Sequence, residues 1–164
     1  MNRLQQWQRA RLPELRGGAT AVQGDTPVTV LAYHFWDPVR FDPQFDFLEC
    51  AIRETWRLCG LLKTVLVVNR VTPRLEAFAA EASGWVALDV AKNLVPGNIH
   101  SMSVDCNRNL YRRFDSEYVL IIQNDGFPIR PGLERFVGRW DYIGAPYVRN
   151  TLRNRLICNA LNCW

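Results

Sequence analysis

The sequence contains no window that approaches the roughly 18 to 20 consecutive apolar residues of a membrane-spanning helix. Its first 24 residues also lack the apolar core of a secretory signal and instead carry arginines among glutamines. We therefore expect a soluble, cytoplasmic protein without a membrane span. The 164 residues, 48% of them hydrophobic, are enough for one domain with a real core and too few for two full ones.

Several common catalytic signatures are also missing. No glycine-rich phosphate loop follows a predicted strand, and the serine-hydrolase motif Gly-x-Ser-x-Gly does not occur. The only histidines are His34 and His100, and the cysteines form no Cys-x-x-Cys pair of the kind that structural zinc sites use. We interpret all of the cysteines as reduced thiols: Cys50, Cys59, Cys106, Cys158 and Cys163.

The positive charge is concentrated at the two ends of the chain. The formal net charge is +4, but residues 1–16 and residues 148–164 each carry +3, whereas residues 17–147 carry −2. A protein that follows nucleic-acid phosphates needs a basic face on its folded body. The distribution therefore argues against a nucleic-acid partner.

Apolar, β-branched runs alternate with helical patterns along the middle of the chain. The predicted strands are residues 28–35, 64–69, 85–90 and 118–122, and the predicted helices are residues 45–59, 72–82 and 99–114. Asp42 could cap the first of these helices and Gly60 ends it. Connections of this length favour right-handed crossovers, so we predict an α/β fold with an open, mostly parallel twisted sheet flanked by helices.

Composition suggests three regions. Residues 1–27 form a basic arm and linker; a short amphipathic helix up to Pro13 is possible, but we expect a loosely attached arm. Residues 28–147 form the α/β domain. Residues 148–164 begin a C-terminal region that we expect to be incomplete, because the chain stops in an apolar segment without a stop signal.

The strand predicted at residues 118–122 is an unbroken apolar run, which predicts burial on both faces. It ends in Gln-Asn-Asp-Gly, so Asp125 lies where open α/β sheets bind ligands, beyond the carboxyl ends of their strands. His34 ends the first strand and would face the same crevice. The alternatives are that Asp125 only caps a turn and that His34 is structural.

The helix that precedes this strand carries a polar strip beside its core stripe. At about 100° per residue the strip contains Asn98, Asp105, Asn109 and Arg112. Such a strip could hydrogen-bond a base or a ribose, or it could be a solvated helix edge.

The order of these motifs resembles a known enzyme family. The segments 103–109, 118–125 and 131–134 are similar in order and spacing to the nucleotide-binding half of GT-A glycosyltransferases. In that family an Arg-Asn pair on a helix precedes an apolar strand ending in Asp-x-Asp, and a Pro-Gly-x-Leu helix follows. The segments 123–126 and 141–146 resemble an uncharacterised glycosyltransferase-like family whose core motifs read Gln-x-Asp and then Asp-Tyr-Ile-Gly-Ala-Pro.

The resemblance implies a GT-A or Rossmann-like nucleotide-binding half and a hexosyltransferase-like enzyme. Such an enzyme transfers a sugar from a nucleotide-diphosphate sugar to an acceptor. Asp125 would hold Mn²⁺ or Mg²⁺ against the diphosphate, because hard cations prefer carboxylate oxygen and neutralise the departing charge. The implied nucleotide-sugar-binding residues are His34, Phe35, Asn69, Arg70, Asp105, Arg108, Asn109, Gln123, Asn124 and Asp125.

The chain also departs from the family pattern. Gln123 occupies the position of the first acidic residue, so we expect weaker metal binding. In inverting members the catalytic base follows the metal motif at some distance, but only 39 residues follow Asp125. The base then lies in further sequence, as we expect, or Asp141 or some other late residue serves, or the chain is an inactive fragment. The other readings are a non-catalytic module that recruits an anionic partner through its arginine-rich tails, and a purely structural α/β domain.

Overall fold

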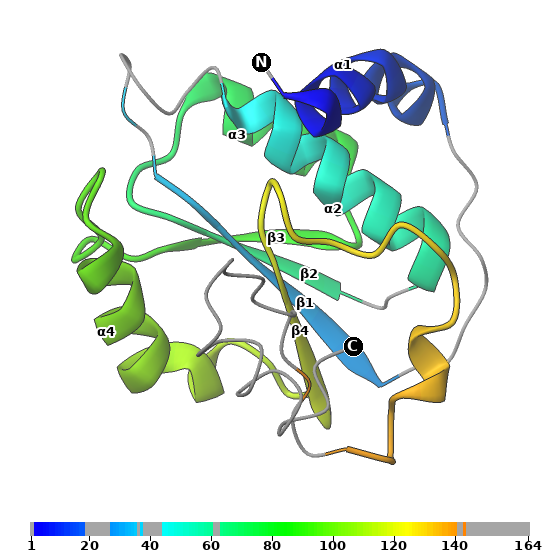
Figure 1. Cartoon of the computed structure of the whole chain (residues 1–164). Helices are drawn as coiled ribbons and strands as arrows, with labels where there is room; N and C mark the ends of the chain where they lie inside the picture. Colours follow the sequence, from blue (N-terminus) through cyan, green and yellow to red (C-terminus); the bar gives the residue numbers. More distant parts are fainter. Residues whose placement is uncertain are drawn as a thin grey trace, which may run out of the picture. The chain divides into compact units, whose positions relative to one another are not determined.

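A computed structural model describes residues 2–18, 27–35, 37, 44–60, 63–140 and 143, and the account that follows is confined to them (Figure 1). Contacts divide the chain into a first unit, residues 1–134, and a second unit, residues 135–164. The sheet, the four α-helices and every cavity discussed below belong to the first unit. In the part of the chain that is described, no helix is both long and apolar enough to cross a membrane.

The sheet has four parallel strands, which confirms the predicted α/β class. They are β1 (Val28–His34), β2 (Lys63–Val68), β3 (Val86–Val90) and β4 (Tyr118–Ile122), in the spatial order β3-β2-β1-β4. β1 pairs with a neighbour on each side, so that Leu31 lies opposite both Val65 of β2 and Ile121 of β4. β1, the first strand along the chain, is therefore an inner strand of the sheet.

Helices cover both faces of the sheet. The elements are α1 (Arg3–Arg16), α2 (Phe45–Cys59), α3 (Pro73–Glu81), α4 (Ile99–Asn109) and the 3₁₀ turns η2 (Leu110–Arg112) and η3 (Leu133–Arg135). Figure 1 shows α1, α2 and α3 on one side of the sheet and α4 on the other. The predicted helix over residues 99–114 is thus shorter than expected, because its last turn tightens into η2.

The ends of the helices follow the local sequence signals. Gly60 adopts a left-handed conformation with φ 58° and ends α2, as predicted, and Thr72 caps α3 in front of Pro73. The residue at the N-cap of α2 is Gln44, which makes no side-chain capping hydrogen bond. The predicted cap, Asp42, lies outside the described residues.

β4 differs from its prediction. We expected a strand buried on both faces, but most of its residues are only half-buried and the side chain of Ile121 is 46% exposed. The physical reason is its place in the sheet. β1 and β2 have strand neighbours on both sides and are nearly covered, whereas β4 is the outer strand of the described sheet.

The N-terminal segment is a helix packed on the first unit, so the expectation of a loosely attached arm was wrong. The buried face of α1 consists of Gln8, Leu12 and Leu15, and the two leucines form a small apolar cluster with Cys50 of α2. Pro13 lies inside the helix rather than ending it. The side of α1 that packs repeats at i, i+4 and i+7 from Gln8, as expected for one face of a helix.

The arginines of α1 are paired with acids of α2. Arg16 forms an ion pair with Glu49, whose carboxylate is buried, and Arg11 lies 3.6 Å from Glu54. Burial alone would raise the pKa of Glu49, but hydrogen bonds from Arg16 and Arg53 outweigh it and hold that pKa below its ordinary value. These contacts weaken the reading in which this tail is free to recruit an anionic partner.

Two thiols of α2 provide a first prediction. Burial raises the pKa of Cys50 to about 12 and that of Cys59 to about 11, and both are free thiols. Because the thiolate is the nucleophile, iodoacetamide at pH 8 should leave both unlabelled in the folded protein and should label both in guanidinium chloride. Peptide mass spectrometry measures the two yields. Rapid labelling of either cysteine in the folded protein would contradict the buried environment.

Candidate functional site

The strand order creates a crevice at the carboxyl ends of β1 and β4. The chain passes from β1 outward through β2 and β3 with α2 and α3 on one face, and then returns with α4 on the other face to add β4. The connections that leave β1 and β4 therefore diverge. In open parallel sheets such a reversal of strand order is where ligands bind.

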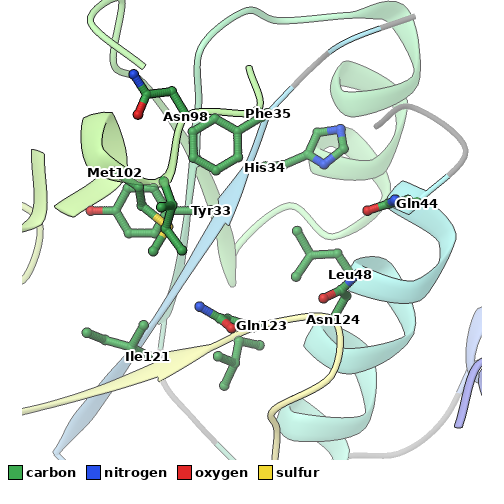
Figure 2. A pocket seen from close by; sticks show the side chains of 13 residues that line it. Tyr33, His34, Phe35, Gln44, Leu48, Asn98, Met102, Ile121, Gln123 and Asn124 are labelled. Atoms are coloured by element: carbon green, nitrogen blue, oxygen red, sulfur yellow. The ribbon is translucent and has the colours of Figure 1, made fainter. Parts of the chain in front are cut away.

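A cavity of about 280 Å³ occupies this crevice (Figure 2). Pockets for drug-sized ligands usually measure about 300 to 1,000 Å³, so this one suits a single ring-sized group. The residues that line it are Tyr33, His34, Phe35, Gln44, Leu48, Gly97, Asn98, Ile99, Met102, Ile121, Ile122, Gln123 and Asn124.

The end of β1 supplies walls on two sides because strand side chains alternate. Tyr33 and Phe35 pack with the apolar cluster around Leu31 and Val65, while His34 points to the opposite face. The ring of His34 lies 5.0 Å from the ring of Phe45 of α2. Figure 2 shows this divergence, with His34 directed toward α2 and Phe35 lying beside Asn98.

The polar part of the lining is dominated by carboxamides. Gln44, Asn98, Gln123 and Asn124 contribute four of them, and the described lining contains no aspartate, glutamate, lysine or arginine. A carboxamide presents both a donor and an acceptor. Aromatic and aliphatic walls with such a rim favour an uncharged, planar group with polar edges.

β4 leads directly into a tight turn at the rim. The backbone N–H of Gln123 donates to the carbonyl of Gly126 at 2.9 Å, and the N–H of Gly126 donates back at 3.3 Å. Gln123 and Asn124 line the cavity, whereas Asp125 is exposed at the tip of the turn and does not. In the described residues no group of three or more His, Cys, Asp or Glu side chains could hold a metal ion.

A buried ionic network lies behind the cavity. Asp105 is 0% exposed and accepts hydrogen bonds from the Tyr33 hydroxyl at 3.1 Å, from Asn109 Nδ2 at 2.8 Å and from Arg113 at 2.5 and 3.1 Å. Burial alone would raise the pKa of Asp105, but the hydrogen bonds from Arg113 and Asn109 lower it below its ordinary value. Burial raises the pKa of Tyr33, so its hydroxyl stays protonated. Asp105 does not line the cavity itself, but it accepts a hydrogen bond from Tyr33, which does.

The chain is similar to the DUF5672 family over residues 90–162. This family is described only as proteins of unknown function, and the match covers less than half of the chain. No curated protein and no solved structure matches the chain. The part of the cavity that α4 and β4 supply falls within the DUF5672 match, and the part that β1 and α2 supply lies before it.

The structure brings together five of the predicted site residues. His34, Phe35, Gln123 and Asn124 line the cavity, as the parallel arrangement of β1 and β4 requires, and so does Asn98 of the predicted polar strip. Sequence reasoning missed the remaining walls because periodicity assigned their apolar members to the core. They are Tyr33, Gln44, Leu48, Gly97, Ile99, Met102, Ile121 and Ile122.

The other predicted residues do not line this cavity. Asn69 and Arg70 follow β2, and Arg108 is exposed on α4. Asn109 instead lines a second hollow of about 390 Å³, together with Lys63 at the start of β2 and the arginines that follow α4. The predicted polar strip of α4 is therefore distributed along the helix, with Asn98 at one cavity and Asn109 at another. Asp141 lies outside the described residues.

Proposed function

We propose that the protein binds a nucleotide-diphosphate sugar and transfers the sugar to an acceptor, as a glycosyltransferase of the hexosyltransferase type. The observation that carries the proposal is the cavity at the carboxyl ends of β1 and β4, with aromatic walls and four carboxamides. Its size and uncharged lining suit the nucleobase rather than the phosphates. In this arrangement Phe35 and Tyr33 would contact the face of the base, and Asn98 and Gln123 would read its polar edge.

The diphosphate would extend from the cavity past the turn at residues 123–126. Asp125, exposed at the tip of that turn, is the one carboxylate that follows the lining residues directly and would hold Mn²⁺ or Mg²⁺. A bound cation of this kind neutralises charge on a departing diphosphate. Because Asp125 is the single carboxylate in the turn at residues 123–126, we expect water and phosphate oxygens to supply most of the ligands and the metal to bind weakly without nucleotide.

We place the protein in the cytoplasm in this proposal. The support is that Cys50, Cys59 and Cys106 are free thiols. Disulfides persist mainly in oxidising compartments, so free cysteines fit a reducing one.

Isothermal titration with UDP, GDP and their sugar conjugates, each with and without Mn²⁺, tests the proposal. We expect one of the two nucleotides to bind, more tightly with Mn²⁺, and the matching nucleoside to bind weakly without dependence on the metal. Pyrophosphate without Mn²⁺ should not bind measurably, because the described lining contains no lysine or arginine. Absence of binding by both nucleotides to the folded protein would refute the proposal.

The Asp125→Asn variant tests the contribution of the metal to nucleotide affinity separately from the contribution of the base. We expect it to remove the Mn²⁺-dependent part of nucleotide affinity, at least about tenfold, since even outer-shell changes at metal sites cost that much. Affinity for the nucleoside should be unchanged. Asp115→Asn is the matched control, because it removes an exposed carboxylate that precedes the amino-terminal end of β4. Equal losses in the two variants would show that general charge, not a ligand at Asp125, is responsible.

A further inference from the structure

We propose that Gln8 of α1 is a positioning residue for the candidate site, fixing the turn at residues 123–126 from the side of the N-terminal helix. The inference concerns the geometry of the cavity rim. It therefore goes beyond the proposed function and stands whether or not the ligand is a nucleotide.

Gln8 connects three elements through one side chain. It is 1% exposed, and its Nε2 donates to the carbonyl of Asn124 at 2.6 Å and to the carbonyl of Phe47, in the first turn of α2, at 3.2 Å. A carboxamide buried to this degree is costly unless it is hydrogen-bonded. The two carbonyls give the physical reason for a glutamine among the leucines of the inner face of α1.

A second contact holds the chain just beyond the turn. The rings of Trp7 and Phe127 are stacked, with centroids 6.2 Å apart and an interplanar angle of 26°. Successive residues of α1 thus contact the turn and the residue that follows it. The helix itself is anchored on α2 through Leu12, Leu15 and the Arg16–Glu49 ion pair.

The hydrogen bond from Gln8 adds to the internal hydrogen bonds of the turn. Two backbone hydrogen bonds between Gln123 and Gly126 close it, and it follows the outer strand of the described sheet. Two of its residues, Gln123 and Asn124, line the cavity. Because Gln8 holds the carbonyl of Asn124, it determines how the backbone presents these side chains to a ligand.

Gln8 is not optimised for stability alone. Its Oε1 is buried and has no hydrogen-bond partner among the described residues. A buried unsatisfied acceptor is unfavourable, so an apolar residue of similar length would avoid that cost at a position that served packing only. The side chain is instead suited to donating to two carbonyls at once.

Gln8→Met tests the inference, since it keeps the length of the side chain and removes both hydrogen bonds. Amide hydrogen exchange measured by NMR should become at least about tenfold faster at Gln123 and Gly126. The amides of Leu66 and Val67 in the centre of β2 should change much less. Gln6→Met, on the exposed side of the same helix, is the matched control and should leave the turn amides unchanged.

Ligand binding gives the second readout. If UDP or GDP binds the parent protein, Gln8→Met should weaken that affinity by about twofold to tenfold, because the ligand must then order the turn.

Unchanged exchange at the turn in folded Gln8→Met overturns the inference, and so does an equal acceleration of all amides, which would mark Gln8 as structural only. Should Gln8→Met fail to fold, Trp7→Ala removes the partly exposed stacking ring and is judged by the same exchange at Gly126. If neither nucleotide binds the parent protein, the proposed function fails while hydrogen exchange still decides the role of Gln8.

Discussion

The Asp105→Asn variant is expected to lose about 3 to 5 kcal/mol of unfolding free energy, which is the cost of breaking a buried ion pair by removing one partner. The Asp105 side chain is fully buried and that of Arg113 is 7% exposed, so loss of the carboxylate leaves the buried guanidinium with the partly exposed Asp89 as its ionic partner. The total free energy of unfolding of a typical domain is only about 5 to 15 kcal/mol. Urea denaturation followed by tryptophan fluorescence measures the loss as a shift of the midpoint.

Asp89→Asn is the matched control for this prediction. Asp89 lies 2.5 Å from the same guanidinium, but its side chain is 42% exposed. Exposed ion pairs contribute about 0 to 1 kcal/mol, so this variant should be close to the parent protein. Similar losses in the two variants would mean that burial of Asp105 does not determine the energetics of the network.

The same carboxylate makes stability depend on pH in a defined direction. The pKa of Asp105 is lower in the folded protein than in the unfolded chain, since hydrogen bonds from Arg113 and Asn109 outweigh the effect of burial. Its contribution is therefore complete above the unfolded-state pKa of about 3.9 and is lost as pH falls through the lower folded-state value. Asp105→Asn should accordingly lose less stability than the parent protein on acidification below about pH 4.

Phe35→Leu is expected to weaken binding of UDP or GDP by roughly fivefold to 150-fold, because stacking of a base on an aromatic ring contributes about 1 to 3 kcal/mol. Leucine retains apolar volume beside the core cluster that Phe35 contacts, so the fold should persist. The ring is lost at the wall of the cavity. Titration of the parent protein and the variant, together with the matching nucleoside, measures the effect on the base separately from the diphosphate.

The control for Phe35→Leu is the same substitution at Phe78, which is buried in α3 and does not line the cavity. It should lower stability and leave nucleotide affinity unchanged. If Phe35→Leu leaves affinity unchanged as well, the base does not stack on this wall, and the assignment of the cavity to a nucleobase would be wrong even if nucleotides bind elsewhere.

Binding data and exchange data together would define which part of the site each element supplies. α1 holds the turn, β1 supplies the aromatic walls, and the network around Asp105 holds Tyr33 at one of them. The aromatic walls and the network around Asp105 depend on the sheet itself. Loss of the contacts between α1 and the turn would leave the cavity in place and disorder its rim.

The sequence alone determined the local elements. Apolar periodicity located β4 at its observed residues, the glycine at position 60 ended α2, and the Thr72-Pro73 pair began α3. The lengths of the connections required a parallel sheet, and parallel strands bring their carboxyl ends to one edge. That is why His34 could be predicted to lie at the same edge of the sheet as the turn that follows β4, whereas Phe35, Gln123 and Asn124 were implied by the family resemblance.

Only the tertiary structure decided what each apolar or charged face contacts. Periodicity identifies an apolar face but not the element against which that face packs. It therefore could not predict that α1 packs on α2, or that β4 is the outer strand of the described sheet. Asp105 looked like a ligand-binding residue in a polar strip until the fold placed Tyr33, 72 positions earlier in the chain, against its carboxylate. Contacts across such separations follow from the strand order β3-β2-β1-β4, which sets the neighbours of every helix and which no local signal encodes.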